Sequence, residues 1–357
     1  LSMLVNQLQT KKNIFVEKTV GVKKYIAPNI RPLDVVNTAR DQAVAIFKNS
    51  PTYLFYETLR GFNFRTLASL YNEKPSMEYT TYEKGALAGK NGVIDLIKDL
   101  NNVLGYEIVA NNDTLLNYRT GMYASELIKH DIRNKSISRK VYNYHDNFEN
   151  EDHIVSGVTE GKTEHPLASS VALNPSGQRV SDFPARTYVV PTSLHNRSDG
   201  QHATPDNTYP YEAYGAEKWL QRRNSQMTQI KTGLTVNIIC HGNTYVNAGQ
   251  KVILNLPYTA AVKTSDGQTN DRFYKGPFLI KNIRHDFEFD KSPQKHTMIM
   301  SLVKDSIEEP LDSPLDNYEP FAQGDVTIIK QKENYDGVET KIVPPGIFGG
   351  VTKSDDS

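Results

Sequence analysis

Two histidine–aspartate pairs are the first residues whose types could do chemistry. His285 and Asp286 are consecutive in KGPFLIKNIRHDFEFDKSPQKHTMIMSL, and His130 and Asp131 are consecutive in ELIKHDIR. A histidine in contact with a carboxylate can act as a general acid or base. Both stretches have the pattern of strands, and consecutive residues of a strand point to opposite faces of a sheet. We therefore expect both pairs to be structural or rim positions.

Phosphate, metal and acyl-transfer motifs are weak or absent. The segment GALAGKNG, residues 85–92, precedes a predicted helix, but it lacks the Walker spacing and the Ser or Thr after its lysine. The sequence contains no HExxH motif, no spaced His/Cys set and no GxSxG elbow. We predict no catalytic residue, no metal and no cofactor.

Acidic residues and the one cysteine have simpler interpretations. The clusters FENEDH and SIEEPLD fall in a predicted loop and tail, where carboxylates are normally solvated. Glycosidase carboxylates pair in space rather than in sequence, so the sequence leaves that activity open. Cys240 alternates with Leu234, Val236 and Ile238, which predicts a small buried hydrophobe.

Composition limits the class of partner. The 41 basic and 41 acidic residues give a formal net charge of zero, which argues against sequence-specific nucleic-acid binding and against a membrane partner. A single cysteine excludes a disulfide framework. The 20 tyrosines favour strands and contact faces, because their rings pack while their hydroxyls stay wet. We expect a soluble protein, made in a cytoplasm, whose partners are proteins.

The elements predicted for residues 1–148 form an α+β domain. Helical spacing covers PLDVVNTARDQAVAIF, and TYLFYETLRGFNFRTLASL has the pattern of a hairpin that turns at Arg60 and Gly61. A second helix is predicted over NGVIDLIKDLNNVLG, residues 91–105, with Gly105 as its cap. Residues from YEIVAN to the end of this region are predicted to be strands joined by polar turns. Leu1 opens in mid-pattern, so we expect this region to hold at most a remnant of a first barrel.

The remaining residues divide into three parts. Residues 149–208 are rich in Gly, Ser, Thr, Pro and Asn, which predicts a long surface loop. Residues 209–304 carry a helix with Trp219, followed by the four strand-like runs LTVNIIC, QKVILNL, GPFLIKNI and HTMIMSLV, which predict a small β-barrel. Residues 305–357 are predicted to be an extended tail. The expected fold class is thus α+β: a mixed domain, a long loop, a small tube-like barrel and a tail.

The segments NAGQKVILNLP and YKGPFLIKNIRHDFEFDKSPQKHTMIMSLVKD resemble the C-terminal tube-like barrel of baseplate central hub proteins from contractile-tailed phages. In that family a glycine precedes a strand of the hydrophobic floor, and a later strand ends in a histidine-containing turn before a Thr-rich closing strand. Five residues fit this layout: Gly249, Val252, Gly276, His285 and Thr297. Type VI secretion spike proteins share the hub part, but no repeat region like theirs follows Lys304.

The resemblance implies a structural protein without enzymatic activity. In such hubs three copies form a ring between the tail tube and the puncturing spike, and each chain contributes two similar barrels. Only one barrel is evident here. The implied partners are two further copies of the chain, the spike protein, the tail tube protein and other baseplate proteins. The implied location is the tail baseplate of the virion, after assembly in the host cytoplasm.

Two other functions remain as alternatives. A baseplate-associated cell-wall glycan hydrolase would need two carboxylates that face each other across a cleft, and a zymogram on peptidoglycan would reveal it. A carbohydrate- or receptor-binding module would need solvent-facing aromatic residues in a groove. For the hub, we predict that aromatic and branched residues carry the subunit interface. The predicted contacts are Trp219, Tyr258, Phe273, Phe278 and Ile280.

Overall fold

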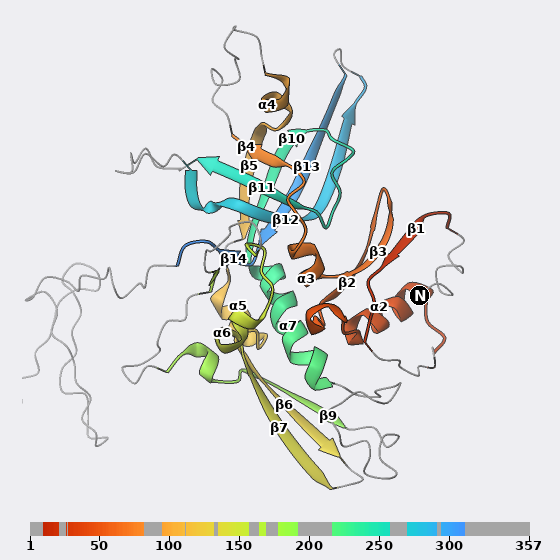
Figure 1. The fold of residues 1–357 in the computed structure, drawn as a ribbon, viewed down its shortest axis with the longest axis vertical. Coiled ribbons are helices and arrows are strands. Elements are labelled where there is room, and N and C mark those ends of the chain that lie inside the picture. Colours follow the sequence, from red (N-terminus) through yellow and green to blue (C-terminus); the bar gives the residue numbers. More distant parts are fainter. Residues whose placement is uncertain are drawn as a thin grey trace, which may run out of the picture. The chain divides into compact units, whose positions relative to one another are not determined.

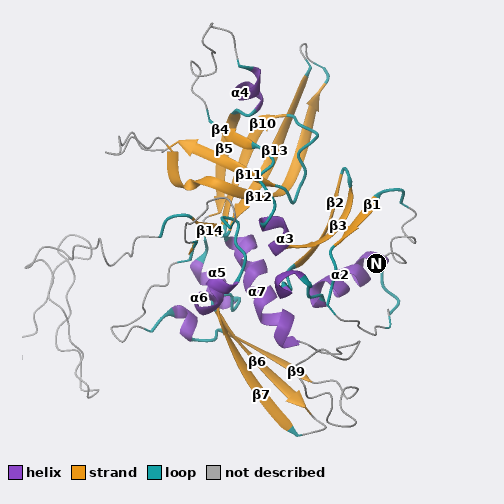
Figure 2. Ribbon diagram, viewed as in Figure 1, coloured by secondary structure: helices purple, strands orange, loops and turns teal. Residues whose placement is uncertain are grey.

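The computed structural model describes residues 10–20, 26, 28–81, 95–110, 112–131, 135–156, 164–168, 178–191, 216–257, 270–290 and 294–310. Contacts divide the chain into two units, Leu1–Pro310 and Leu311–Ser357, and every described residue belongs to the first. This described part mixes helices with a larger share of strands (Figures 1 and 2). The predicted α+β class is confirmed at that level.

The largest sheet contains the four strands predicted near the carboxyl end. Its strand order is β4-β11-β12-β13-β10-β5; β4 and β11 run parallel, and all other neighbours run antiparallel. The four predicted strands are confirmed and lie next to one another as β11, β12, β13 and β10. The bounds are β4 Glu78–Thr80, β5 Val103–Ala110, β10 Leu234–His241, β11 Lys251–Pro257, β12 Asn270–Glu288 and β13 Lys295–Lys304.

This sheet curls into a half-barrel around its own core (Figure 2). An isolated bridge between Thr80 and Asn102 brings β4 to the start of β5, so the first and last strands meet at one point. Alternate residues of the strands point inward, as the two-residue period of a strand requires. Each buried aliphatic side chain stabilises the fold by roughly 1.5–3 kcal/mol. The fully buried inward residues are Tyr79, Val236, Ile238, Val252, Leu254, Phe278, Ile280, Met298, Met300 and Leu302.

Two glycines and a bulge shape this sheet. Gly249 has a φ of +83° in the turn before β11, and Gly276 has a φ of +98° within the 19-residue strand β12. A register shift between Ile280 and Asn282 adds a bulge, which increases strand bending. His285 lies inside β12, three residues before its end at Glu288. The expectation of a histidine-containing turn at this position is therefore wrong.

The N-terminal sheet has the strand order β1-β3-β2, with bounds β1 Asn13–Val16, β2 Tyr53–Thr58 and β3 Gly61–Thr66. The predicted hairpin is confirmed, and Gly61 supplies the φ of +148° at its turn. The helix predicted from Pro32 is α2, Pro32–Gln42; it stops earlier than expected, and Phe47–Asn49 forms the separate 3₁₀ turn η1. Helix α2 and this sheet share a core of Val36, Ala45, Tyr53 and Phe64.

A third sheet, of order β7-β6-β9, lies beside several short helices. Its middle strand β6 pairs antiparallel with β7 and parallel with β9. The prediction that residues 112–148 contain only strands is wrong, because Asp113 and Asn143 cap short helices there. The remaining bounds are α3 Leu67–Tyr71, α5 Thr114–Arg119, β6 Ala124–Asp131, β7 Ser136–Asn143, α6 Tyr144–Asn147, η2 Phe148–Asn150, β8 His165–Pro166, η3 Val180–Asp182, β9 Arg186–Pro191 and β14 Ser306–Ile307.

Helix α7, Ala216–Thr232, is confirmed as predicted and connects the three sheets. Gln221 donates to the backbone oxygens of Ser125 and Lys140 in the third sheet. Arg223 donates to the oxygen of Tyr53, and Gln229 donates to the oxygen of Asp305. The polar side chains of α7 therefore hold the elements together from inside. Among the helices in the described ranges, none is long and apolar enough to cross a membrane.

Three segments differ from their predicted structure. In the predicted helix 91–105, only α4, Leu96–Leu100, is helical in the described part; Gly105 is no cap, because it lies in β5 and pairs with Ile239. In the predicted surface loop 149–208, Ile154 and Val155 are buried in a core cluster with Leu70. The tail predicted from residue 305 begins with buried residues, since β14 pairs with β8.

Candidate assembly surface

Strand β5 forms one edge of the six-stranded sheet. It pairs with β10 on one side. Its sequence VLGYEIVA has a single charged residue, Glu107. Near-continuous apolar runs are typical of strands that are buried on both faces, whereas edge strands usually carry charges or prolines that prevent further pairing. The composition of β5 is therefore typical of an interior strand, although β5 lies at the edge of the sheet.

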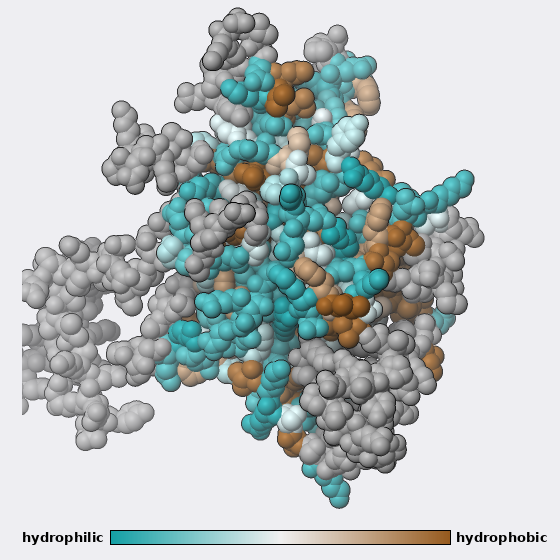
Figure 3. All heavy atoms as spheres, in the orientation of Figure 1, coloured by the Kyte–Doolittle hydropathy of each residue, from teal (hydrophilic) through white to brown (hydrophobic). Residues whose placement is uncertain are grey.

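Apolar side chains around β5 are exposed to solvent. The exposed fraction of Val109 is 54%, and that of Ile97 in the neighbouring helix α4 is 73%. Brown apolar atoms are visible at this end of the sheet, near α4 (Figure 3). Contiguous apolar patches of this kind mark interaction sites. We call the following eight residues the β5 edge: Leu96, Ile97, Leu100, Leu104, Tyr106, Ile108, Val109 and Ile239.

Part of the β5 edge is continuous with the core of the half-barrel. Tyr106 pairs with Ile238, and Ile108 pairs with Val236. Directly paired residues share one face of a sheet. Ile238 and Val236 are fully buried on the inward face, so Tyr106 and Ile108 extend the same apolar face to solvent. The core of the sheet is thus open along β5, where another protein surface can cover it.

The predicted His285–Asp286 pair lies at the far end of β12 and does not form a dyad. The Nδ1 of His285 lies 3.1 Å from the Nε2 of His296, while Asp286 accepts a hydrogen bond from Arg284 at 2.8 Å. Burial and the neighbouring His296 lower the pKa of His285. The ring of His296 stacks on that of Phe287 at 4.1 Å. The expected orientation to opposite faces is confirmed, and the histidine belongs to an aromatic strip.

A buried polar cluster was missed by the sequence analysis. His153 donates from Nε2 to the oxygen of Phe148 at 2.8 Å, and its Nδ1 lies 3.0 Å from a carboxylate oxygen of Asp305. The second carboxylate oxygen of Asp305 accepts from the backbone N–H of Ile154. Burial alone would lower the pKa of His153, but the hydrogen bond and charge of Asp305 raise it above the ordinary value. No sequence signal connects two residues that are 152 positions apart.

This cluster has the composition of a catalytic dyad but no access for a substrate. The void beside it has a volume of about 10 Å³, which is room for one water molecule. Next to it, Glu151 accepts hydrogen bonds from Tyr142, Arg222 and Gln226. The prediction that the acidic cluster FENEDH is solvated is therefore wrong for Glu151. These groups are buried hydrogen-bonding partners that fix the fold around α7.

Of the five predicted contact residues, three lie in β12 and one lies in α7. Phe278 and Ile280 are 0% and 1% exposed, so both belong to the core of the half-barrel and present no surface to a second chain. Phe273 in β12 and Trp219 in α7 are half-buried. Tyr258 lies outside the described residues. None of the five belongs to the exposed apolar residues of the β5 edge.

Three further chemical candidates are Cys240, the segment GALAGKNG and possible metal ligands. Cys240 is fully buried, as predicted, and burial raises the pKa of its thiol to about 12. The segment GALAGKNG lies outside the described residues. Within the described ranges, no group of three or more His, Cys, Asp or Glu side chains is arranged to hold a metal ion. Comparison of the chain with models of known protein families, and with curated protein sequences, gives no match.

Proposed function

We propose that this chain is a structural subunit of a phage tail baseplate hub, which joins the tail tube to the cell-puncturing spike as part of a ring of three chains. The proposal rests on the resemblance of the C-terminal segments and on one structural observation, the apolar β5 edge. A protein whose task is assembly needs surfaces that become buried between copies. It needs no tuned catalytic groups.

The layout of the resembling residues supports the proposal. Gly249 precedes β11, whose Val252 is part of the buried floor, and Gly276 has a positive φ within β12. Thr297 lies in β13, opposite Asp286. These residues lie on neighbouring strands of one sheet, although His285 lies in a strand rather than in a turn.

The β5 edge gives this role a physical basis. An open strand edge with apolar side chains promotes uncontrolled association unless a partner covers it. In a closed ring the edge of each copy is covered by the next copy. Because all copies make the same contacts, no edge stays exposed. A hub of three chains is one such arrangement, and it needs the edge of each chain to meet a different surface of its neighbour.

Electron microscopy of the purified chain tests the proposal. At micromolar concentration we expect ring-shaped particles with threefold symmetry. Images that contain only single chains, or open filaments without a fixed number of subunits, would contradict the hub role.

The glycan hydrolase alternative has less support. A hydrolase needs one carboxylic acid and one carboxylate, both free to approach the substrate. Glu17 and Glu73 line a groove in the described part of the chain. However, Glu17 accepts hydrogen bonds from the backbone and hydroxyl of Thr66, and Glu73 pairs with Arg65 at 2.6 Å. Both carboxylates already have partners within the chain.

A further inference from the structure

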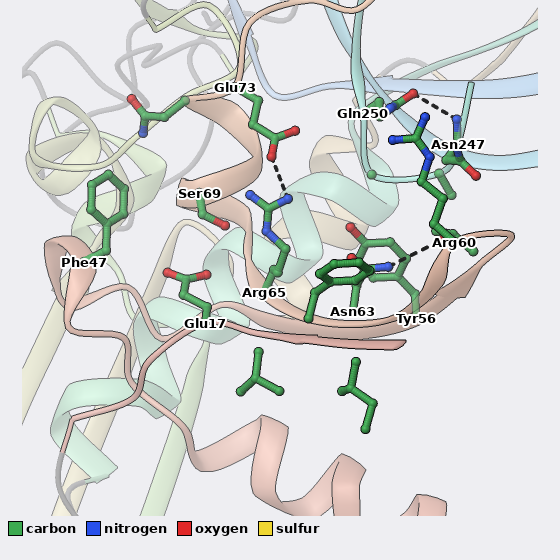
Figure 4. Close-up of a pocket in the computed structure, with 17 residues that line it drawn as sticks. Glu17, Phe47, Tyr56, Arg60, Asn63, Arg65, Ser69, Glu73, Asn247 and Gln250 are labelled. Carbon is green, nitrogen blue, oxygen red and sulfur yellow. Dashed lines mark hydrogen bonds and ion pairs between the residues drawn. The ribbon is translucent and has the colours of Figure 1, made fainter. Parts of the chain in front are cut away.

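The groove that contains these carboxylates lies between the N-terminal sheet and the half-barrel (Figure 4). Its volume is about 890 Å³. Ligand pockets typically have volumes of about 300–1,000 Å³. The floor is the face of the N-terminal sheet that points away from α2, and the walls come from α3 and from the turn before β11. The groove is therefore large enough for a ligand and is built by three separate elements.

One half-exposed aromatic ring lies on the floor of this groove. Phe15 in β1 is opposite Asn63 in β3, and Asn63 is opposite Tyr56 in β2, so the three side chains form a row across the sheet. The exposed fraction of Phe15 is 46%. Tyr56 is half-buried, and this burial raises its pKa to about 12. A flat apolar ring exposed among polar groups can stack on the C–H face of a ligand.

Four amide side chains line the groove, and each is held by one end. The Nδ2 groups of Asn63, Asn72 and Asn247 donate to the backbone oxygens of Gly61, Ala68 and Tyr245. The Oε1 of Gln250 accepts from the backbone N–H of Asn247 at 2.9 Å. Among the described residues, the other end of each amide has no hydrogen-bond partner. The groove thus offers three fixed amide oxygens as acceptors and one amide nitrogen as a donor.

Charge in the groove is nearly balanced. Arg65 is paired with Glu73, and Glu17 is bound to Thr66. Arg60, at the turn of the β2–β3 hairpin, is exposed and has no ion-pair partner in the described part of the chain. Free donors and free acceptors therefore occur together. A carboxylate or a fully ionised phosphate ester can only accept hydrogen bonds and would leave the three amide oxygens unsatisfied.

We propose that this groove binds an oligosaccharide, whose sugar ring stacks on Phe15 while its hydroxyl groups hydrogen-bond to the amides of Asn63, Asn247 and Gln250. Sugar hydroxyls donate and accept, which matches the mixed set of free groups. Because the ligand would lie on the face of the sheet rather than along one of its edges, recognition falls to side chains. That favours a sugar over an extended peptide, which binds mainly through its backbone at a sheet edge. This inference does not depend on the proposed hub role.

Isothermal titration calorimetry of the whole chain tests the proposal, with chitotetraose, maltotetraose and tetragalacturonate as probes. We expect at least one of them to bind at a single site. Replacing the ring, Phe15→Ala, is expected to weaken that binding by at least about tenfold, while Phe15→Trp preserves it. The matched control Phe289→Ala removes an exposed ring far along the chain and should leave binding unchanged.

Several results would overturn the proposal. Binding of none of the three probes would do so, as would equal binding by wild type and Phe15→Ala. Displacement of the sugar by inorganic phosphate would instead identify an anion site at Arg60. Displacement by an extended peptide would identify a strand-binding edge. Circular dichroism of each variant confirms that the fold is retained, so a loss of binding can be assigned to the groove.

Discussion

At the scale of single residues, His153 is held in a setting that requires a proton on both ring nitrogens. Its Nε2 faces the backbone oxygen of Phe148, which can only accept, and its Nδ1 faces the carboxylate of Asp305. The ring also stacks on Phe148 at 3.7 Å. The charged form is therefore stabilised by folding, which is the reason that its pKa is raised.

The stability of the fold should depend on pH through this histidine. An unfolded histidine has a pKa of about 6.5, and the folded value is higher. The stabilisation is therefore complete below the unfolded value and is lost as pH rises through the folded value. We expect the free energy of unfolding of wild type, minus that of His153→Gln, to fall as the pH rises from about 6.5 through the higher pKa of the folded state.

Urea unfolding at several pH values measures this difference. The variant serves as the reference, because other groups titrate in the same range in both proteins. A difference that stays constant or grows with pH would show that His153 is not charged in the folded chain.

At the scale of elements, two phenylalanines in or next to β12 differ in their exposure to solvent. Phe278 is fully buried in the half-barrel core, whereas Phe289, directly after the strand, is 69% exposed. Phe278→Ala should lower the free energy of unfolding by about 3–5 kcal/mol, because it leaves a cavity. Phe289→Ala should change it by at most about 0.5 kcal/mol. Equal effects in chemical denaturation would contradict the assignment of β12 to the core.

A charge introduced in the β5 edge should weaken assembly and leave the stability of the single chain nearly unchanged. Val109→Lys places a charge on an exposed position, so the free energy of unfolding should change by less than about 1 kcal/mol. Assembly should weaken, because the lysine must lose its water when a second surface covers the edge. Tyr245→Lys, at an exposed turn position away from the edge, is the matched control. Sedimentation velocity compares the two, and unchanged association of Val109→Lys would exclude this edge as a contact.

The elements that could be predicted are those whose local pattern agrees with their final surroundings. The hairpin before Thr66 needed a glycine at its turn, and Gly61 provides it. Helix α7 carries helical spacing and is followed by Gly233. Residues 103–105 were misassigned because Val103, Leu104 and Gly105 also fit a helix end. Their pairing with β10, more than a hundred residues later, decides the structure.

Sites formed by tertiary packing could not be predicted from the sequence. The groove takes Phe15, Asn63 and Gln250 from three elements that are distant along the chain. The acidic residue Glu151 looked like part of a solvated loop, yet it is enclosed by Tyr142 and Arg222. Local patterns report which face of an element is apolar, but they do not report which elements will meet.

At the scale of the whole molecule, the described part has a buried interior around α7 and an apolar face that is exposed along β5. Helix α7 joins the three sheets through buried hydrogen bonds, so the fold does not depend on a partner to satisfy those groups. The half-barrel, in contrast, leaves an apolar face uncovered along β5. The central claim of the hub proposal is that other copies of the chain cover the β5 edge.

Multi-angle light scattering of the purified chain tests that claim most directly. The proposal predicts a mass of three chains at micromolar concentration, and a shift toward the mass of one chain for Val109→Lys but not for Tyr245→Lys. A mass of one chain for wild type across the whole concentration range would contradict it.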